Sequence, residues 1–323
     1  MPINKIGGFL GQEKKETLQP NIYHDCLALT SGRACISLII EKNDVSTIYL
    51  PYFICNAVLQ PLIKYHINYK FYSLNKNLEI INPPHFLKTN EMLLYVNYFG
   101  LISKYSAKLS KKYSNKLILD NSHAFFHKSL DSCWSFNSAR KFFGVADGAY
   151  IYSPVTLDKK TRYKKATHDI NYLHLRNSED NQEAYKKYLI HENNFTCEIK
   201  LISDHSSSLL KHIDYQACIN SRSKNFKYLH TNLMSKNLLN IPLPLCKQVP
   251  LYYPLLINKN IRQKMIAMGI FIPLLWKEVI TREIKGYEWE KHLASNLVLL
   301  PLDQRYDIDD MNYLINSLTK LIS

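Results

Sequence analysis

Short apolar runs alternate with helical segments in the first half of the chain. The strand-like runs are residues 47–50, 67–72, 92–100 and 116–120. Parallel strands need a long connection, usually a helix, so this order favours a parallel sheet with crossover helices. Ligands of such sheets bind beyond the carboxyl ends of the strands. We therefore expect an α/β fold with its site along that edge of the sheet.

The stretch 117–152 carries the strongest chemical signal at that edge. Asp120 ends an apolar run, His123 follows it, and Lys141 stands in a polar turn between two further strand-like runs. A carboxylate can keep a pyridine nitrogen protonated and a lysine can form a Schiff base with an aldehyde, so the pair suits pyridoxal phosphate (PLP). A lysine in a turn is more often a solvated surface residue. The flanking Asp120 and His123, with Asp147 downstream, favour the site interpretation here.

A second segment has the pattern of a phosphate-binding turn. Residues 30–32 are small and polar, and an apolar helical pattern follows them. Free N–H groups and the helix dipole favour a phosphate at such a helix start, although an ordinary N-cap has the same sequence. Tyr52 and Phe53 either cover one face of a flat cofactor or pack in the core. The sequence alone leaves both alternatives open.

Composition limits the classes of partner. The net charge of +14 is compatible with nucleic acid, anionic membranes or phosphorylated ligands. The basic residues are scattered, however, and their densest cluster, 159–165, has no nucleic-acid-binding motif beside it. No apolar run reaches the roughly 20 residues of a membrane span. We expect neither nucleic acid nor a membrane as a partner.

The cysteines indicate no metal site and no disulfide framework. There are seven of them, scattered along the chain without a CxxC pair. Reduced thiols in a cytoplasmic protein are the simplest interpretation. The N-terminal residues have no apolar segment of the kind found in secretory signals, which agrees with a cytoplasmic location.

Beyond the first half, the chain has three parts: an irregular segment over residues 155–200, called the excursion below, a helical segment over residues 203–239, and a C-terminal tail over residues 240–323. Residues 155–200 are charged and irregular, with helical composition near 180–190, and residues 203–239 have a helical pattern. The other expected elements are strands at 132–136, 148–152, 250–256, 271–275 and 296–300, and helices at 33–40, 55–65, 103–114, 259–268 and 308–322.

Two prolines mark a domain boundary. Pro242 and Pro244 follow the helical segment and precede the strands of the tail. We therefore expect a large domain over residues 1–239 and a small α+β domain over residues 240–323.

In their order and spacing, the motifs of this chain resemble the DegT-type sugar aminotransferases, PLP-dependent enzymes of fold type I. The segments that carry the resemblance are 7–9, 30–34, 97–100, 120–123, 135–141, 147–148, 222–226 and 300–306. The resemblance implies a large domain with a mostly parallel mixed sheet flanked by helices, and a small C-terminal domain. It also implies a homodimer.

The resemblance assigns roles to individual residues. It makes Lys141 the lysine that carries the cofactor, pairs Asp120 with the pyridinium nitrogen, and sets His123 beside the ring or its hydroxyl. Tyr98 would line the acceptor pocket. The phosphate would be held by Ser31, Gly32, Arg33, Ser135 and Ser138.

The activity that follows from the resemblance is transamination. An amino acid, by analogy glutamate, would donate its amino group to a nucleotide-linked keto-sugar in the biosynthesis of amino sugars or surface polysaccharides. The retained lysine argues against the dehydratase branch of the family. Two other interpretations are a PLP enzyme of this fold with another acceptor or reaction, and a non-catalytic protein that uses the fold to bind an anionic partner.

A few positions depart from the family pattern. Asn97 replaces a histidine, Asn121 and Ser122 replace two alanines, and Ala149 replaces a glycine. Trp276 is expected in the core or at a dimer interface.

Overall fold

The computed structural model describes residues 5–14, 18–19, 26–127, 130–157, 163–178, 180–244 and 248–322. Residues 159–162 of the expected basic cluster, and Cys246, lie outside the described residues.

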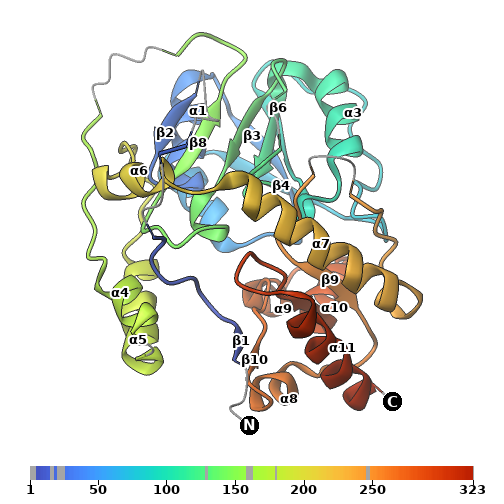
Figure 1. Cartoon of the computed structure of the whole chain (residues 1–323). Helices are drawn as coiled ribbons and strands as arrows, with labels where there is room; N and C mark the ends of the chain where they lie inside the picture. Colours follow the sequence, from blue (N-terminus) through green and yellow to red (C-terminus); the bar gives the residue numbers. More distant parts are fainter. Residues whose placement is uncertain are drawn as a thin grey trace.

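A seven-stranded sheet organises the first half of the chain, with strand order β2-β8-β7-β6-β5-β3-β4 (Figure 1). Its strands are β2 (Leu27–Leu29), β3 (Thr47–Pro51), β4 (Asn68–Tyr72), β5 (Glu91–Val96), β6 (Leu117–Asn121), β7 (Trp134–Asn137) and β8 (Ala149–Tyr152). Only β8 runs against the others, because it pairs antiparallel with β7 and β2. The remaining pairs are parallel. The expected mostly parallel α/β sheet is confirmed.

Apolar runs become the central strands because helices and neighbouring segments exclude water from them. Residues 92–96 of β5 and 117–119 of β6 are all buried, as is typical of parallel strands covered on both faces. Helices α1 (Gly32–Lys42) and α3 (Ser103–Tyr113) connect strands of the sheet and pack on it. The expected helix at 55–65 is a 3-10 turn followed by the short helix α2 (Leu59–Lys64).

The excursion after β8 contains a helical hairpin. Helices α4 (Asn171–Asn177) and α5 (Asn181–Asn193) pack on each other and stand apart from the sheet (Figure 1). The N-terminal segment runs along this hairpin (Figure 1). The ring of Phe9 stacks on that of Tyr188, at 4.6 Å between centroids. The expected helical composition near 180–190 corresponds to α5.

The segment predicted as helical over 203–239 is broken into two helices. Helix α6 (Asp204–Leu210) ends before a turn, and α7 (Tyr215–Leu233) begins at Asp214, whose carboxylate accepts a hydrogen bond from the amide of Ala217. An acidic N-cap of this kind starts a new helix because it satisfies an amide that has no partner within the helix. Figure 1 shows α7 crossing between the sheet and the C-terminal elements.

The C-terminal elements form a smaller α+β arrangement. Strands β9 (Tyr253–Leu256) and β11 (Leu297–Leu300) pair antiparallel, and β10 (Ile270–Phe271) pairs with the N-terminal β1 (Ile6–Gly7). The expected strand at 271–275 is thus reduced to two residues. The helices are α8 (Arg262–Ala267), α9 (Lys277–Thr281), α10 (Glu288–Asn296) and α11 (Ile308–Ile322), of which α9 and α10 were not expected. The boundary near residue 240 stays a prediction.

A buried arginine of α7 joins these parts. Arg222 is 1% exposed. Its guanidinium donates to the carbonyl oxygens of Pro250, Leu251 and Phe142 and to the side-chain oxygen of Gln304. Burial lowers the pKa of Arg222, and the carboxylate of Asp303 opposes that shift. The guanidinium therefore holds the segment after Lys141 against residues from the C-terminal part.

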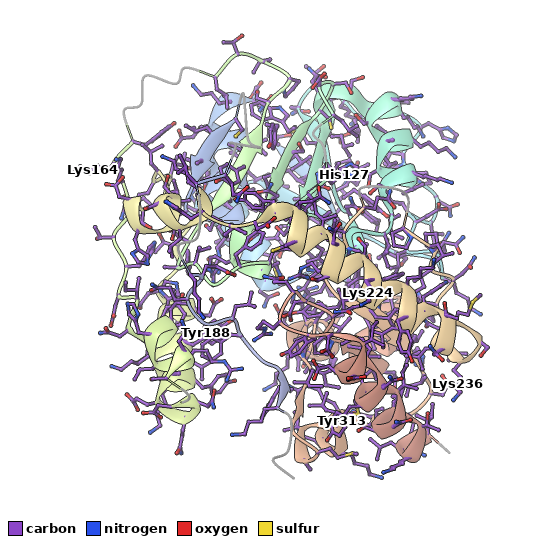
Figure 2. All side chains as sticks on the ribbon, viewed as in Figure 1. His127, Lys164, Tyr188, Lys224, Lys236 and Tyr313 are labelled. Carbon is purple, nitrogen blue, oxygen red and sulfur yellow. The ribbon has the colours of Figure 1, made fainter. Side chains whose placement is uncertain are left out.

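We predict that Arg222→Met lowers the free energy of unfolding by about 3 kcal/mol, because it removes a buried donor and leaves several acceptors unpaired. The control is Lys224→Met on the same helix, whose side chain is exposed (Figure 2). That change should stay within about 0.5 kcal/mol. Urea unfolding followed by circular dichroism measures both, and equal losses would contradict the structural role of Arg222.

Candidate active site

The parallel strands bring the predicted acid, histidine and lysine to one edge of the sheet. Asp120 lies near the carboxyl end of β6, and His123 follows in the next turn. Lys141 ends a 3-10 turn, Ala139–Lys141, that follows the neighbouring strand β7. Because β6 and β7 are adjacent and parallel, segments that leave their carboxyl ends emerge side by side.

The half-buried Lys141 contacts the buried His123. The Nζ atom of Lys141 lies 3.4 Å from Nε2 of His123. Burial lowers the pKa of Lys141, and the nearby positive charges of Arg140 and Arg33 lower it further, whereas Cys55 and Asp120 oppose the shift. Burial, together with the charge of Lys141, holds the pKa of His123 well below its usual value. Each pKa is therefore shifted toward the neutral form of its group.

The hydrogen bonds around His123 agree with two neutral groups. The amide of Phe99 donates to Nδ1 of His123 at 3.4 Å. The proton of the neutral ring is then assigned to Nε2, which faces Lys141. A neutral amine can accept that hydrogen bond and a protonated one cannot. The arrangement suits a lysine that acts as a nucleophile or base, because either role needs a free electron pair.

Asp120 is an acid that lacks a strong cationic partner among the described residues. Its carboxylate accepts a hydrogen bond from the amide of Ser122 at 2.8 Å. Burial raises the pKa of Asp120, and the Ser122 hydrogen bonds and the charge of Lys141 only partly oppose this shift. A protonated ring nitrogen beside the carboxylate would stabilise its charged form, so Asp120 fits the pyridinium of PLP.

The start of α1 meets the same edge. Ser31 is the N-cap, and its hydroxyl accepts a hydrogen bond from the amide of Ala34 at 3.3 Å. Gly32 packs so closely that an added Cβ would lie 2.9 Å from the ring of Phe136, and Phe136 is the direct neighbour of Asp120 across the β6–β7 pair. The amides that open α1 therefore lie on the Asp120 side of the sheet.

Two arginines, Arg33 and Arg140, lie close to the start of α1. The guanidinium of Arg33 donates to the carbonyl of Phe195, and that of Arg140 lies 4.2 Å from the centre of the Phe195 ring. Arg140 also forms an ion pair with Glu192. Burial and the charge of Arg140 lower the pKa of Arg33. An anion such as a phosphate at the start of α1 would offset this concentration of cations.

The structure separates the two predicted serines. Side chains alternate along a strand, and the register pairs Ser135 with Leu119 and Phe136 with Asp120. Ser135 therefore points to the opposite face from Asp120. Its buried hydroxyl has no hydrogen-bond partner among the described residues. The structure thus does not bring Ser135 to the start of α1.

Ser138 lies much closer to that helix. The amide of Ala139 donates to the carbonyl of Gly148, and the amide of Gly148 donates to the carbonyl of Thr30. Through Gly148, these two backbone hydrogen bonds connect the turn that contains Ser138 and Lys141 to Thr30, the residue before Ser31.

Tyr98 lies in the core rather than in an open pocket. It is fully buried, and its hydroxyl donates to the carbonyl of Phe53 at 2.7 Å. Its ring packs on that of Phe53 at 5.7 Å between centroids. The predicted contact between Tyr98 and an acceptor is therefore not supported by its position.

Two site residues come from parts of the sequence that gave no clear signal. The ring of Trp276 lies nearly parallel to His123, 5.8 Å away, and meets the edge of Phe53 at 4.9 Å. Trp276 is 9% exposed, in agreement with the expected core position. Cys55 is close enough to Lys141 for each to shift the pKa of the other. Both contacts depend on tertiary packing, which the spacing of residues in the sequence does not reveal.

Asn97 and Asn121, two of the positions that differ from the family pattern, are hydrogen-bonded to each other. The side-chain amide of Asn97 donates to the side-chain oxygen of Asn121 at 3.1 Å and to the hydroxyl of Ser103 at 3.2 Å. Its oxygen accepts from the amide of Ile102. The two replacements therefore form a buried polar bridge between β5 and β6 beneath the site.

The described residues contain no group of three or more His, Cys, Asp or Glu side chains that could hold a metal ion. They also contain no helix with the length and apolar character needed to cross a bilayer.

No family model and no curated protein matches this sequence. Solved structures do match. A DegT DnrJ EryC1 StrS aminotransferase from Brucella abortus has a TM-score of 0.63 at 13% identity, covering 91% of this chain and 85% of that one. PseC from Helicobacter pylori, an aminotransferase of pseudoaminic acid biosynthesis, has a TM-score of 0.62 at 15% identity, covering 92% and 86%.

A third structure, the sugar aminotransferase CalS13 from Micromonospora echinospora, has a TM-score of 0.61 at 10% identity, covering 92% of this chain and 87% of that one. The fold of this chain is the fold of these aminotransferases, that of fold-type I PLP enzymes. At such identities the likeness establishes the fold, and the chemistry has to be argued from the side chains.

The depressed pKa of His123 predicts a pH-dependent loss of stability. Below its usual pKa of 6.5, the unfolded chain binds a proton at His123 that the folded protein does not bind, so stability falls as the pH falls. Between pH 7 and pH 5 the wild type should lose about 2 kcal/mol more than His123→Gln.

Denaturant unfolding at several pH values measures this difference. The exposed His85 provides the control, because His85→Gln should leave the pH dependence unchanged. If His123→Gln and the wild type had parallel pH profiles, His123 would not be held neutral by burial.

Proposed function

We propose that the chain is a PLP-dependent aminotransferase that moves an amino group from an amino acid, by resemblance glutamate, to the keto group of a nucleotide-linked sugar. The observation that carries the proposal is the contact of 3.4 Å between the half-buried Lys141 and the buried His123, beside the buried Asp120. It occurs on a fold shared with sugar aminotransferases. The Spr1654 protein of Streptococcus pneumoniae, with a TM-score of 0.64, has been solved in PLP and PMP forms.

The residues of the site fit PLP. Lys141 would hold the aldehyde carbon, Asp120 the ring nitrogen, and the amides of Gly32 and Arg33 the phosphate. When bound, PLP supplies an electron-withdrawing ring that stabilises negative charge at the α-carbon of an amino acid.

The protein's own contribution is the control of protons and water. Burial lowers the pKa of Lys141, and its unprotonated Nζ can take a proton from the donor's α-carbon. The Nε2–H group of His123 orients the lone pair on Nζ and supplies a fixed dipole beside it. Trp276 and Phe53 cover this contact with apolar surface, which strengthens electrostatic interactions because water is excluded.

The identity of the acceptor rests on the fold and the resemblance. The burial of Tyr98 removes one expected acceptor contact, so a PLP enzyme of this fold with another acceptor is the alternative that the geometry favours most. The resemblance also supports a homodimer, and the scattered cysteines favour a cytoplasmic location. Light scattering on the purified protein would test the dimer.

The first test is the visible absorbance of protein reconstituted with PLP. We expect a band in the wild type that glutamate removes, and no such band in Lys141→Ala. Lys104→Ala, an exposed lysine on α3, should retain it. A wild type without the band would contradict both enzyme interpretations, and a band that glutamate leaves unchanged would favour a different reaction.

Asp120→Asn provides a separate prediction. An amide cannot stabilise a protonated ring nitrogen as a carboxylate does, so the half-reaction with glutamate should slow by roughly 100-fold or more. Single-turnover absorbance measures the rate, and Asp131→Asn, an exposed acid, is the control. Unchanged kinetics in Asp120→Asn would remove Asp120 from the proposed mechanism.

A further inference from the structure

Helix α3 lies on the outer side of the sheet and carries a row of exposed lysines (Figure 1). Its buried residues recur every three or four positions and face the sheet. The opposite side of the helix, called the lysine face below, consists of Lys104, Lys108, Lys111 and Lys112. Because these lysines are spaced three or four residues apart, they are neighbours along the helix.

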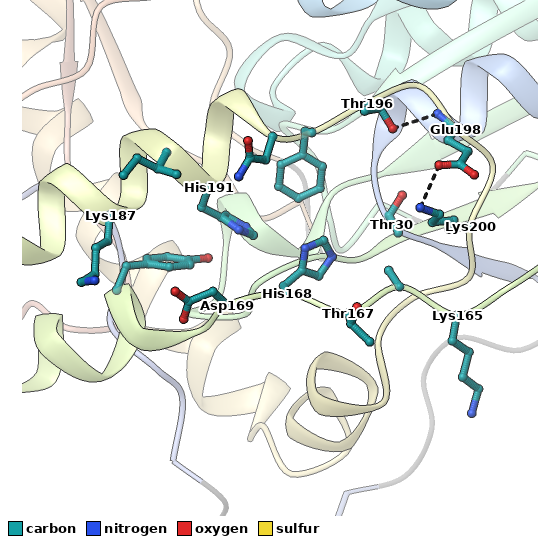
Figure 3. A pocket seen from close by; sticks show the side chains of 15 residues that line it. Thr30, Lys165, Thr167, His168, Asp169, Lys187, His191, Thr196, Glu198 and Lys200 are labelled. Carbon is teal, nitrogen blue, oxygen red and sulfur yellow. Dashed lines mark hydrogen bonds and ion pairs between the residues drawn. The ribbon is translucent and has the colours of Figure 1, made fainter.

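No carboxylate of the described residues forms an ion pair with the lysine face. A contrast is the cavity of about 370 Å³ that the excursion forms with Thr30 beside Phe195 (Figure 3). Each lysine that borders this cavity has a carboxylate within 4 Å, and Lys200 pairs with Glu198 at 2.7 Å. The charge of the lysine face is therefore free to act on a partner outside the protein.

Two acids lie near α3 but outside the lysine face. Burial raises the pKa of Tyr105 to about 12, and the nearby Glu79 adds to this rise. Asp131 precedes Ser132, whose hydroxyl bonds to that of Ser110 on the buried side of the helix. Segment 103–116 itself contains five lysines and no acidic residue. This side of the molecule is therefore strongly positive.

The loop over residues 80–88 runs beside α3 and adds an exposed aromatic ring. The hydroxyl of Tyr113 donates to the carbonyl of Pro84, and Nζ of Lys116 donates to the carbonyl of Leu87 at 2.8 Å. Phe86 lies between these two anchored residues, and its side chain is 77% exposed. The end of α3 therefore holds a phenyl ring in solvent next to the lysine face.

The combination of charge and an apolar ring distinguishes between classes of partner. A nucleic acid duplex or another polyanion would neutralise the lysines but leave Phe86 in water. An anionic bilayer accommodates both, because its headgroups attract lysines and its interfacial region takes up apolar side chains. Lysine, a strongly hydrated point charge, also suits a surface of phosphates without fixed geometry.

We propose that the lysine face and the loop 80–88 dock on an anionic lipid bilayer, with the lysines at the headgroups and Phe86 in the interfacial region. Each lysine close to such a surface strengthens binding by roughly fivefold. The proposal does not depend on the proposed function, since it involves neither PLP nor a substrate.

This proposal differs from the expectation that no membrane is a partner. That expectation was based on the missing membrane-spanning run and on the isolated basic cluster at 159–165. Binding at the surface of a bilayer requires no spanning run. The lysine face forms only when α3 folds, because its members are separated by other residues in the sequence.

The test is sedimentation of the full-length protein with vesicles, made either of equal parts phosphatidylglycerol and phosphatidylcholine or of phosphatidylcholine alone. Lys108→Glu combined with Lys111→Glu reverses the middle of the lysine face. The matched control is Lys224→Glu combined with Lys227→Glu, which has the same spacing and the same change in net charge on the exposed side of α7.

The wild type should bind the anionic vesicles and not the neutral ones. The α3 pair should weaken this binding by about 25-fold or more, because each lost lysine accounts for roughly fivefold. The α7 pair should weaken it by less than about threefold, because salt screens charges that lie more than roughly 10 Å from the membrane. Circular dichroism checks that both double variants are folded.

Phe86→Ser tests the insertion of the ring. It should weaken binding to the anionic vesicles by about fivefold or more, because it removes the apolar group that enters the bilayer. The control is Ile63→Ser on α2, which packs on α1, since Ile63 is also exposed, at 64%. Its effect should stay below about twofold.

Equal binding to the two kinds of vesicle, equal losses in the two lysine pairs, or full binding by Phe86→Ser would overturn the proposal. The same proteins are tested for a shift of duplex DNA in a gel. A shift that the α3 pair abolishes, without binding of the wild type to anionic vesicles, would assign the lysine face to a nucleic acid and also overturn the proposal.

Discussion

The carbonyl oxygen of Phe142 accepts hydrogen bonds from two side chains that come from distant parts of the chain. Arg222 of α7 donates at 3.3 Å and Gln304 of the C-terminal part at 2.9 Å, and these two side chains also bond to each other at 3.0 Å. Phe142 directly follows Lys141. The position of the lysine therefore depends on a buried polar network that is fully formed only when both parts of the chain are folded together.

The chemistry follows from that placement. A lysine held in a turn at the surface would be charged and unreactive, whereas burial beside His123 favours a neutral amine. Asp120 contributes a negative charge near Lys141, and Arg33 at the start of α1 contributes a positive one. The charge distribution thus matches a ligand with a cationic ring nitrogen at one end and a phosphate at the other, which is the charge pattern of PLP.

The sequence predicted the sheet well because continuous apolar runs such as 92–96 and 117–119 are distinctive of buried parallel strands. Asp120, His123 and Lys141 were found for the same reason, since they follow predicted strand ends. Ser135 shows the limit of this reasoning. One residue of register decides which face of a strand a side chain occupies, and motif likeness does not fix that register.

Contacts between segments that are distant in the sequence could not be predicted from the sequence either. Trp276 contacts His123 although nearly half of the chain separates them, and nothing in its local sequence indicates this. The short helices α9 and α10 were missed because tertiary packing, rather than a long periodic pattern, determines them. The cavity beside Phe195 likewise depends on how the excursion folds back on Thr30 and Asp147.

The most direct measurement of the central claim is peptide mass spectrometry after the PLP-loaded protein is reduced with borohydride, which fixes the cofactor to whichever lysine holds it. The account predicts that the modification maps to Lys141 and is abolished by Lys141→Ala without redistribution to other lysines. A modification spread over the surface lysines, or retained in Lys141→Ala, would contradict it.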